Sequence, residues 1–182
     1  VLEGINVGDI YLLSMQEIFS NISTSIKKST EVLNISGEVV PVSLDTISIC
    51  AELTDGTIVK TKEEIPKVVR EKREPIQRVY IEPSNARPTP RVLEAIEEAD
   101  VIVIAPGNLY TEIIPNMIVK NIAHKIKISD AKKIYVANIM TDAGQTDEYN
   151  LSDHIKAMTE HLGENIFDYC LADNRKYSSR IY

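Results

Sequence analysis

Apolar residues recur at helical spacing near the start of the chain. Residues three, four or seven apart share one side of an α-helix, so the segment LLSMQEIFSNISTSIKKSTEVLNI predicts two short helices. The apolar positions that carry this pattern are Leu12, Met15, Phe19, Ile22, Ile26 and Leu33.

The period changes after this segment. The stretch EVVPVSLDTISICAELTDGTIVK alternates between apolar and polar residues and is rich in β-branched side chains. Asp55 and Gly56 are residue types that close a tight turn, so this stretch predicts an antiparallel hairpin. The following EEIPKVVREKREP is charged and bounded by prolines, which predicts an exposed connection.

Strands and helices alternate in the second half of the chain. The strand candidates are IQRVYIEP, VIVIA, KIYVAN and FDYCLAD. Helices are expected after Thr89-Pro90, through MIVKNIAHKI, and over residues 152–162. Apolar strands that alternate with helices indicate a mostly parallel sheet with helices on both faces. The predicted fold is therefore a Rossmann-like α/β domain over residues 1–182, with a small β-hairpin region.

Composition narrows the class of protein. With 182 residues, of which 43% are hydrophobic, the chain can bury one core. A net charge of −7 and few aromatic residues argue against a nucleic-acid-binding surface. The cysteines, Cys50 and Cys170, have no metal-ligand spacing, and no membrane span or signal peptide is visible. We therefore expect a cytoplasmic protein.

The end of the VIVIA strand is a candidate ligand site. In sheets of this kind, ligands bind beyond the carboxyl ends of the strands. Here Pro106, Gly107 and Asn108 lead to a helix start near Thr111 or Pro115. Glycine lets a ligand approach the backbone, and free amides at a helix start favour an anion. A phosphate or a carboxylate is the expected ligand group.

The end of the next strand, KIYVA, is a second candidate. The loop NIMTDAGQTDEY has more hydrogen-bonding capacity than a turn requires. Its polar positions are Asn138, Thr141, Asp142, Gly144, Gln145, Thr146 and Asp147. Together the two loops predict an anion or nucleotide pocket.

Simpler interpretations of these residues stay open. Asn108 and Thr111 are also of the types that cap a helix, and Thr146 and Asp147 could likewise only begin the next one. Tyr110 fits a packing residue as well as a ring that stacks on a base or sugar.

No motif for metal or nucleophilic chemistry is present. His154 and His161 are seven residues apart, but no carboxylate or cysteine stands at ligand spacing, so no metal site is predicted. There is neither a P-loop nor a G-x-G-x-x-G motif, and no motif anchors a Ser-His-Asp triad.

Several longer motifs resemble a known family. ADVIVIAPGNLYTEIIPN is similar to the GPGSLYTSIIPN signature of the YvcK family, the bacterial gluconeogenesis factors, which are related to the CofD 2-phospho-L-lactate transferases. YVANIMTDAGQTDEYN resembles that family's YVCNLMTQPGETDGY. AELTDGTIVKTKEEIPK and RVYIEPSNARPTPRVLEAIEEAD are similar to two further family segments, so the resemblance covers nearly the whole chain.

The resemblance implies a ligand site at both loops. Gln145 stands where the family commonly has glutamate, and Asn108 stands in place of serine. Near the start, Ile5 and Asp9 replace the family's histidine and asparagine. The family's Gly-rich GGGTG loop is expected before Val1, so the domain shown is expected to lack that portion. The implied ligand-binding residues are Gly107, Asn108, Tyr110, Thr111, Asn138, Thr141, Gly144, Thr146 and Asp147.

The resemblance also implies a function. It implies a cytosolic regulatory protein that binds a nucleotide sugar, UDP-N-acetylglucosamine above all, and links carbon flux with cell-wall synthesis and cell shape. A regulated protein partner is then expected. The alternatives are a CofD-like transferase that uses a nucleotide-activated substrate and Mg²⁺, and an interaction module without a ligand. No catalytic residue is assigned, Asp9, Asp142 and Asp147 are weak candidates for Mg²⁺ ligands, and the exact nucleotide and any homo-oligomer stay open.

Overall fold

The computed structural model describes residues 6–174. Its helices are α1 (Val7–Phe19), α2 (Ile22–Val32), α3 (Ile65–Lys72), α4 (Pro90–Glu98), α5 (Ile114–Ile118), α6 (Ile122–Ile128) and α7 (Leu151–Leu162), with a π-helical turn at Leu109–Ile113. Its strands are β1 (Ser48–Leu53), β2 (Ile58–Lys60), β3 (Ile76–Glu82), β4 (Val101–Ile104), β5 (Lys132–Val136) and β6 (Tyr169–Leu171). In this part of the chain, no helix has the length and apolar character needed to cross a membrane.

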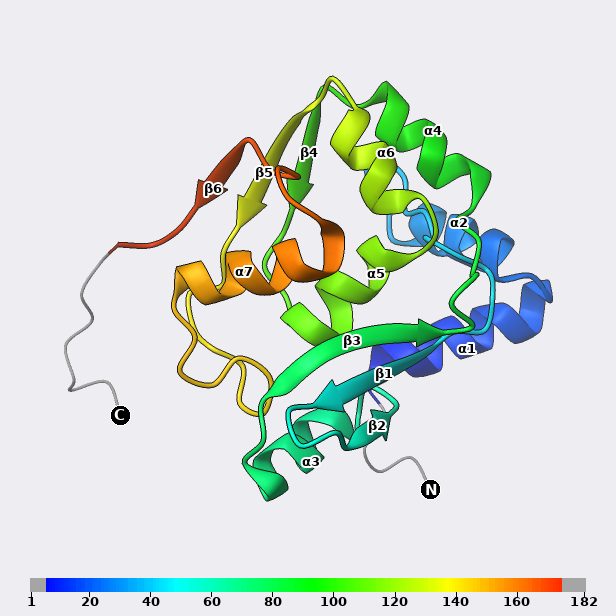
Figure 1. Cartoon of the computed structure of the whole chain (residues 1–182). Helices are drawn as coiled ribbons and strands as arrows, with labels where there is room; N and C mark the ends of the chain where they lie inside the picture. Colours follow the sequence, from blue (N-terminus) through cyan, green and yellow to red (C-terminus); the bar gives the residue numbers. More distant parts are fainter. Residues whose placement is uncertain (1–5, 175–182) are drawn as a thin grey trace.

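The strands form two sheets (Figure 1). The first has the order β2-β1-β3 and is antiparallel, with the predicted hairpin turn at Asp55 and Gly56 between β1 and β2. The second has the order β4-β5-β6 and is parallel. The predicted α/β class and the parallel sheet are therefore confirmed.

Strand β3 joins the hairpin sheet rather than the parallel one. It pairs with β1, with Ile81 opposite Ile49 and Val79 opposite Ala51. Gln77 and Arg78 of β3 are exposed, so this strand is not apolar throughout. A strand with one solvated side fits an antiparallel sheet better than a parallel one.

Helices α4 to α7 cover one face of the parallel sheet (Figure 1). Tyr135 of β5 packs with the residues of α5 and α7, and Ile102 of β4 packs with those of α4 and α6. The opposite face carries apolar side chains that the described residues leave open. Val101 and Val103 are 50% and 53% exposed, and Tyr169 and Leu171 of β6 are similar.

The predicted pair of N-terminal helices is confirmed. Asn6 caps α1 by accepting a hydrogen bond from the Asp9 amide, and Asn21 caps α2 in the same way through the Thr24 amide. The Ser25 hydroxyl then donates to the carbonyl of Met15 at 3.0 Å, which joins the two helices.

The prediction of an exposed connection at EEIPKVVREKREP was wrong. Residues Ile65–Lys72 form helix α3, with Pro66 in its first turn, where a proline does not disturb the helical hydrogen bonds. Ile65 and Val69 are four residues apart, so they lie on the same side of the helix, and both are buried in the core. The charged residues around them masked this short apolar stripe.

The helix predicted through MIVKNIAHKI is divided in two. Helix α5 ends at Ile118, Val119 is extended, and Asn121 is left-handed with a φ of 68° before α6 begins. Asparagine tolerates this conformation better than most residues, which makes it a suitable hinge between two short helices.

Burial of Ile65 predicts that α3 contributes to stability. We expect Ile65→Ala to lower the free energy of unfolding by about 2–4 kcal/mol, because the side chain is fully buried in the core. The exposed Lys67→Ala in the same helix is the control and should cost about 0.5 kcal/mol or less. Urea denaturation of the two variants measures both values, and equal losses would contradict the packing described.

Candidate functional site

Asn138 joins the two predicted loops. Its side-chain amide donates to the carbonyl of Gly107 at 2.8 Å, and its side-chain oxygen accepts from the Gly107 amide at 3.0 Å. Asn138 follows β5 and Gly107 follows β4, so this reciprocal pair continues the pairing of the two strands beyond their carboxyl ends. The structure therefore brings one residue of each predicted loop into direct contact, while binding of an anion or nucleotide there stays a prediction.

The first loop uses its backbone amides internally. The Gly107 amide is bound by Asn138, and the Asn108 amide donates to the Glu112 carboxylate at 3.2 Å. The Glu112 carboxylate therefore accepts the hydrogen bond that the anionic group of a ligand was expected to accept at this loop. The helical segment then begins with a π-helical turn, a rare geometry that is frequent at functional sites.

The side chain of Asn108 does not cap the helix that follows. Among the described residues it has no hydrogen-bond partner, and the same holds for the hydroxyl of Thr141 in the second loop. These are the two predicted site residues whose polar side-chain groups are available to a ligand at the strand ends.

The second loop is held by bonds within itself. The Asp142 carbonyl accepts from the amides of Gln145 and Thr146, and the Thr146 hydroxyl accepts from the Asp142 amide at 2.8 Å. The Asp147 carboxylate accepts from the Gly144 amide at 2.7 Å. Thr146 and Asp147 therefore shape this loop. Helix α7 begins later, at a capping box made by Asn150 and Asp153.

Gly144 packs directly on helix α3. Its φ is +81°, and a Cβ built at this position would lie 2.3 Å from the carbonyl oxygen of Pro66. Both the backbone conformation and the close approach require glycine here. The second loop is thereby pressed against the start of α3.

Two further contacts link the loops through buried side chains. The Thr111 hydroxyl donates to the Gln145 side-chain oxygen at 3.2 Å, and the Tyr110 and Tyr149 hydroxyls lie 2.8 Å apart. Tyr110 is 2% exposed, and burial raises the pKa of its hydroxyl. The packing interpretation of Tyr110 therefore has structural support, while its role as a ligand contact stays a prediction.

Burial also shapes the electrostatics at the strand ends. It raises the pKa of Asp142, the charge of Glu112 raises that pKa further, and His154 opposes the rise. Burial raises the pKa of Tyr135 to about 12. Asp142 is half-buried, and Asn138 donates to one of its carboxylate oxygens, so the other oxygen has no hydrogen-bond partner among the described residues.

Both histidines of α7 form hydrogen bonds with the protein backbone. His154 donates from Nδ1 to the carbonyl of Asn150 at 3.0 Å. His161 donates from Nδ1 to the carbonyl of Ala157 at 2.6 Å, and its Nε2 accepts from the Val79 amide at 2.9 Å. The bond from the Val79 amide to Nε2 satisfies a backbone donor on the side of β3 that faces away from β1. Among residues 6–174, no group of three or more His, Cys, Asp or Glu side chains is placed to hold a metal ion.

Three of the predicted site residues line three different cavities. Asp147 lines a cavity of about 390 Å³ next to α3, Tyr110 one of about 280 Å³ next to α7, and Thr111 one of about 310 Å³ next to β1. Sequence reasoning missed Glu112 and Tyr149, which contact the predicted residues directly. The spacing of Glu112, four residues after Asn108, is the signal that could have found it.

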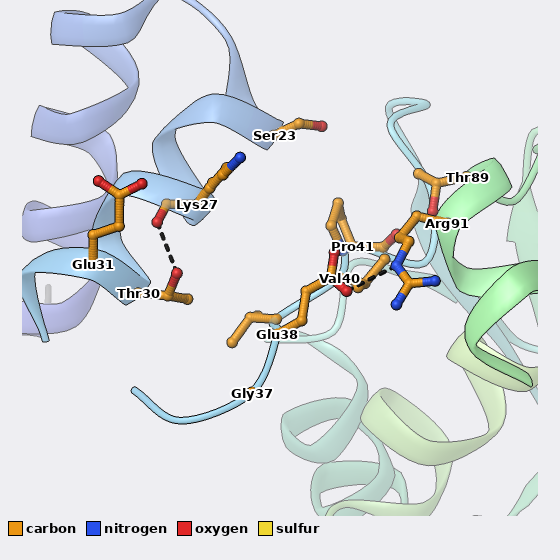
Figure 2. Close-up of a pocket in the computed structure, with 11 residues that line it drawn as sticks. Ser23, Lys27, Thr30, Glu31, Gly37, Glu38, Val40, Pro41, Thr89 and Arg91 are labelled. Carbon is orange, nitrogen blue, oxygen red and sulfur yellow. Dashed lines mark hydrogen bonds and ion pairs between the residues drawn. The ribbon is translucent and has the colours of Figure 1, made fainter. Parts of the chain in front are cut away.

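A further cavity of about 400 Å³ lies away from both loops, between α2 and the segment before α4 (Figure 2). Its lining includes the cations Lys27 and Arg91, and Arg91 is bound by Glu38 at 2.8 Å and by Glu98 at 3.1 Å. Hydrogen bonding to Glu38 raises the pKa of Arg91 further, so this guanidinium is already neutralised within the protein.

Comparison with known proteins places the chain in a family. The family described as 2-phospho-L-lactate transferase CofD matches residues 1–182. The chain belongs to the CofD family. Within it, the chain is similar to the gluconeogenesis factor of Halalkalibacterium halodurans, with 39% identity over 99% of this chain, and to that of Bacillus subtilis, with 34% identity over 99%. The resemblance to gluconeogenesis factors seen in the sequence is therefore confirmed.

A solved structure supports the CofD-like fold. A crystal structure of a Bacillus halodurans protein matches with a TM-score of 0.89 and 40% identity, over 98% of this chain and 56% of that one. The curated relatives are matched over 55% and 56% of their own lengths. This chain thus spans about half the length of the relatives it matches.

Two glycines provide a test of the contact between the second loop and α3. Gly144 and Gly56 have nearly the same φ, +81° and +82°, but only Gly144 has a neighbour within reach of an added Cβ. We expect Gly56→Ala to cost about 1–2 kcal/mol from backbone strain alone, and Gly144→Ala to cost about 2–4 kcal/mol. Chemical denaturation measures both losses, and equal values would contradict the close approach to Pro66.

Proposed function

We propose that this CofD family protein binds a nucleotide sugar of the UDP-N-acetylglucosamine type at the carboxyl ends of β4 and β5, and that it regulates a protein partner. The relatives are named gluconeogenesis factors, which supports a role in bacterial carbon flux. We further propose that this role is cytoplasmic and links carbon flux with cell-wall synthesis and cell shape. The part of the relatives that this chain does not span, with the Gly-rich loop expected from the family, would form the remaining side of the site.

The observation that carries this proposal is the Asn138–Gly107 pair. It fixes two polar loops side by side at the edge where parallel sheets bind their ligands. Beside it, the free side chains of Asn108 and Thr141 offer hydrogen bonds to a base, ribose or sugar.

The diphosphate of such a ligand would compete with Glu112. The amide of Asn108, the natural donor to a phosphate oxygen, is already bound to the Glu112 carboxylate. Binding would therefore require this side chain to swing away. The negative charge of Glu112 also lies near Asp142, so moving it would relieve a repulsion that raises the Asp142 pKa.

The family description keeps a transferase as the second candidate function. A Mg²⁺ ion is commonly held by one or two carboxylates together with substrate phosphates and water. Asp142 is a carboxylate at the strand ends that fits this role, but the described residues contain no group of three or more His, Cys, Asp or Glu side chains placed around a metal. Most of the coordination would therefore fall to substrate and water. We therefore rank nucleotide-sugar binding first.

A ligand panel tests the proposal. Thermal unfolding is followed with UDP-N-acetylglucosamine, other UDP-sugars, GTP and NADP, with and without Mg²⁺. A UDP-sugar at about 100 times its Kd should raise the Tm by about 5 °C or more. In Asn138→Ala the loops lose their link, so we expect most of the shift to disappear, whereas the exposed Asn85→Ala should keep it.

The same panel separates the alternatives. Stabilisation without turnover, unchanged by a chelator, supports the binding function. Metal-dependent conversion of the nucleotide would contradict it in favour of the transferase. If no nucleotide raises the Tm, the protein is an interaction module without this ligand.

Replacement of Glu112 gives an independent prediction. Glu112→Gln keeps an oxygen for the Asn108 amide but removes the charge that competes with the diphosphate. We expect the affinity for UDP-N-acetylglucosamine to rise about threefold to tenfold by isothermal titration calorimetry. Glu17→Gln on α1 is the control, with no change expected; a weaker affinity for Glu112→Gln would show that the carboxylate contacts the ligand favourably.

A further inference from the structure

A cavity of about 390 Å³ lies on the side of the second loop that faces α3. Its walls come from the end of α3, the residues just before β3, and the loop itself, through Arg70, Arg73, Gln145 and Tyr149 among others. Its lining includes none of Gly107, Asn108, Asn138 and Thr141. Its volume suits a small metabolite.

The two arginines of this cavity have no anionic partner. Among the described residues neither Arg70 nor Arg73 forms an ion pair, although Arg70 donates from Nε to the Pro66 carbonyl at 3.0 Å. Arg91, in the cavity of Figure 2, is by contrast bound by glutamates. The backbone of Arg73 is fixed next to the cavity, because it ends α3 in a left-handed conformation and its amide donates to the Val69 carbonyl.

The nearest carboxylates are mostly engaged elsewhere. Glu74 accepts from the Thr54 hydroxyl at 2.6 Å, and Asp147 accepts from the Gly144 amide at 2.7 Å. Glu148 lines the cavity without an ion pair in this part of the chain, which leaves an acceptor for a ligand hydroxyl. The unpaired cationic groups are therefore not explained by the protein's own anions.

Gln145 adds a neutral donor to the cavity. Its side-chain oxygen is occupied by the Thr111 hydroxyl, so its amide nitrogen is the end that remains for another partner. It lines the cavity together with Tyr149, whose ring offers an apolar wall. Guanidinium forks, an amide donor and an aromatic wall suit an oxyanion attached to a polar body.

We propose that this cavity binds a small phosphorylated metabolite, with the phosphate on Arg70 and Arg73 and its hydroxyl-bearing body beside Gln145 and Tyr149. This site shares the second loop with the strand-end site, but its lining includes neither Asn138 nor Gly107. It does not require the nucleotide-sugar function to be correct. Gln145 connects this cavity with the first loop, because its hydrogen-bond partner Thr111 belongs to the turn that follows that loop.

Titration calorimetry with a hexose 6-phosphate tests the site. The unaltered protein should bind it saturably, while the unphosphorylated hexose should not bind. The double variant Arg70→Gln, Arg73→Gln should weaken binding by about tenfold or more, because charge-assisted hydrogen bonds to the phosphate are lost. Arg87→Gln, an exposed arginine elsewhere on the surface, should leave it unchanged.

Three results would overturn the proposal. These are no binding of the hexose phosphate, binding that survives in the double variant, and a loss of UDP-N-acetylglucosamine binding in the double variant equal to the loss of hexose phosphate binding. Saturable binding of inorganic phosphate alone would support it and assign recognition to the phosphate group. If the hexose phosphate binds while no UDP-sugar does, the nucleotide-sugar function fails and this site stands.

Discussion

The reciprocal pair between Asn138 and Gly107 is the constraint on which the strand-end loops depend. A side-chain amide here does what a further pair of backbone groups would do in a longer sheet, and it does so where β4 and β5 have already ended. Asp142 is then held by Asn138, and Thr146 by Asp142. A replacement residue would need both a donor and an acceptor at the same distance from the backbone, as the asparagine amide provides.

The broad architecture was accessible from the sequence because it rests on local periodicity. The alternation of VIVIA, KIYVAN and FDYCLAD with helical segments predicted the parallel sheet that is observed. Strand pairing between distant segments was not accessible in this way. The partner of β3 is decided by packing against β1, and its short exposed stretch at Gln77 and Arg78 was the only local hint.

Helix α3 shows a second limit of local patterns. Two buried residues, Ile65 and Val69, are enough to anchor a short helix, but charged neighbours on the remaining sides give the segment the composition of a loop. In such a helix, most residues are exposed, so the helix propensity and charge of the segment reflect its surface rather than its core contact. The core contact that decides its formation comes from tertiary structure.

The sequence shows which two loops follow neighbouring strands, but it does not show which partners their polar groups bind. Polar residues concentrated in a loop indicate many hydrogen bonds, but they do not say whether the partners belong to a ligand or to the protein. Thr146 and Asp147 bond within their own loop, and Glu112 occupies an amide that sequence reasoning left free. Only coordinates distinguish a donor that is available from one that is already used.

The contact between Gly144 and Pro66 has a consequence for exchange between relatives. The second loop and the first turn of α3 are far apart in the chain, yet no side chain can be inserted between them. A loop taken from a related protein would therefore need its own α3 segment to keep its shape. In natural or designed recombination, the segments around residues 66 and 144 would therefore have to be exchanged together.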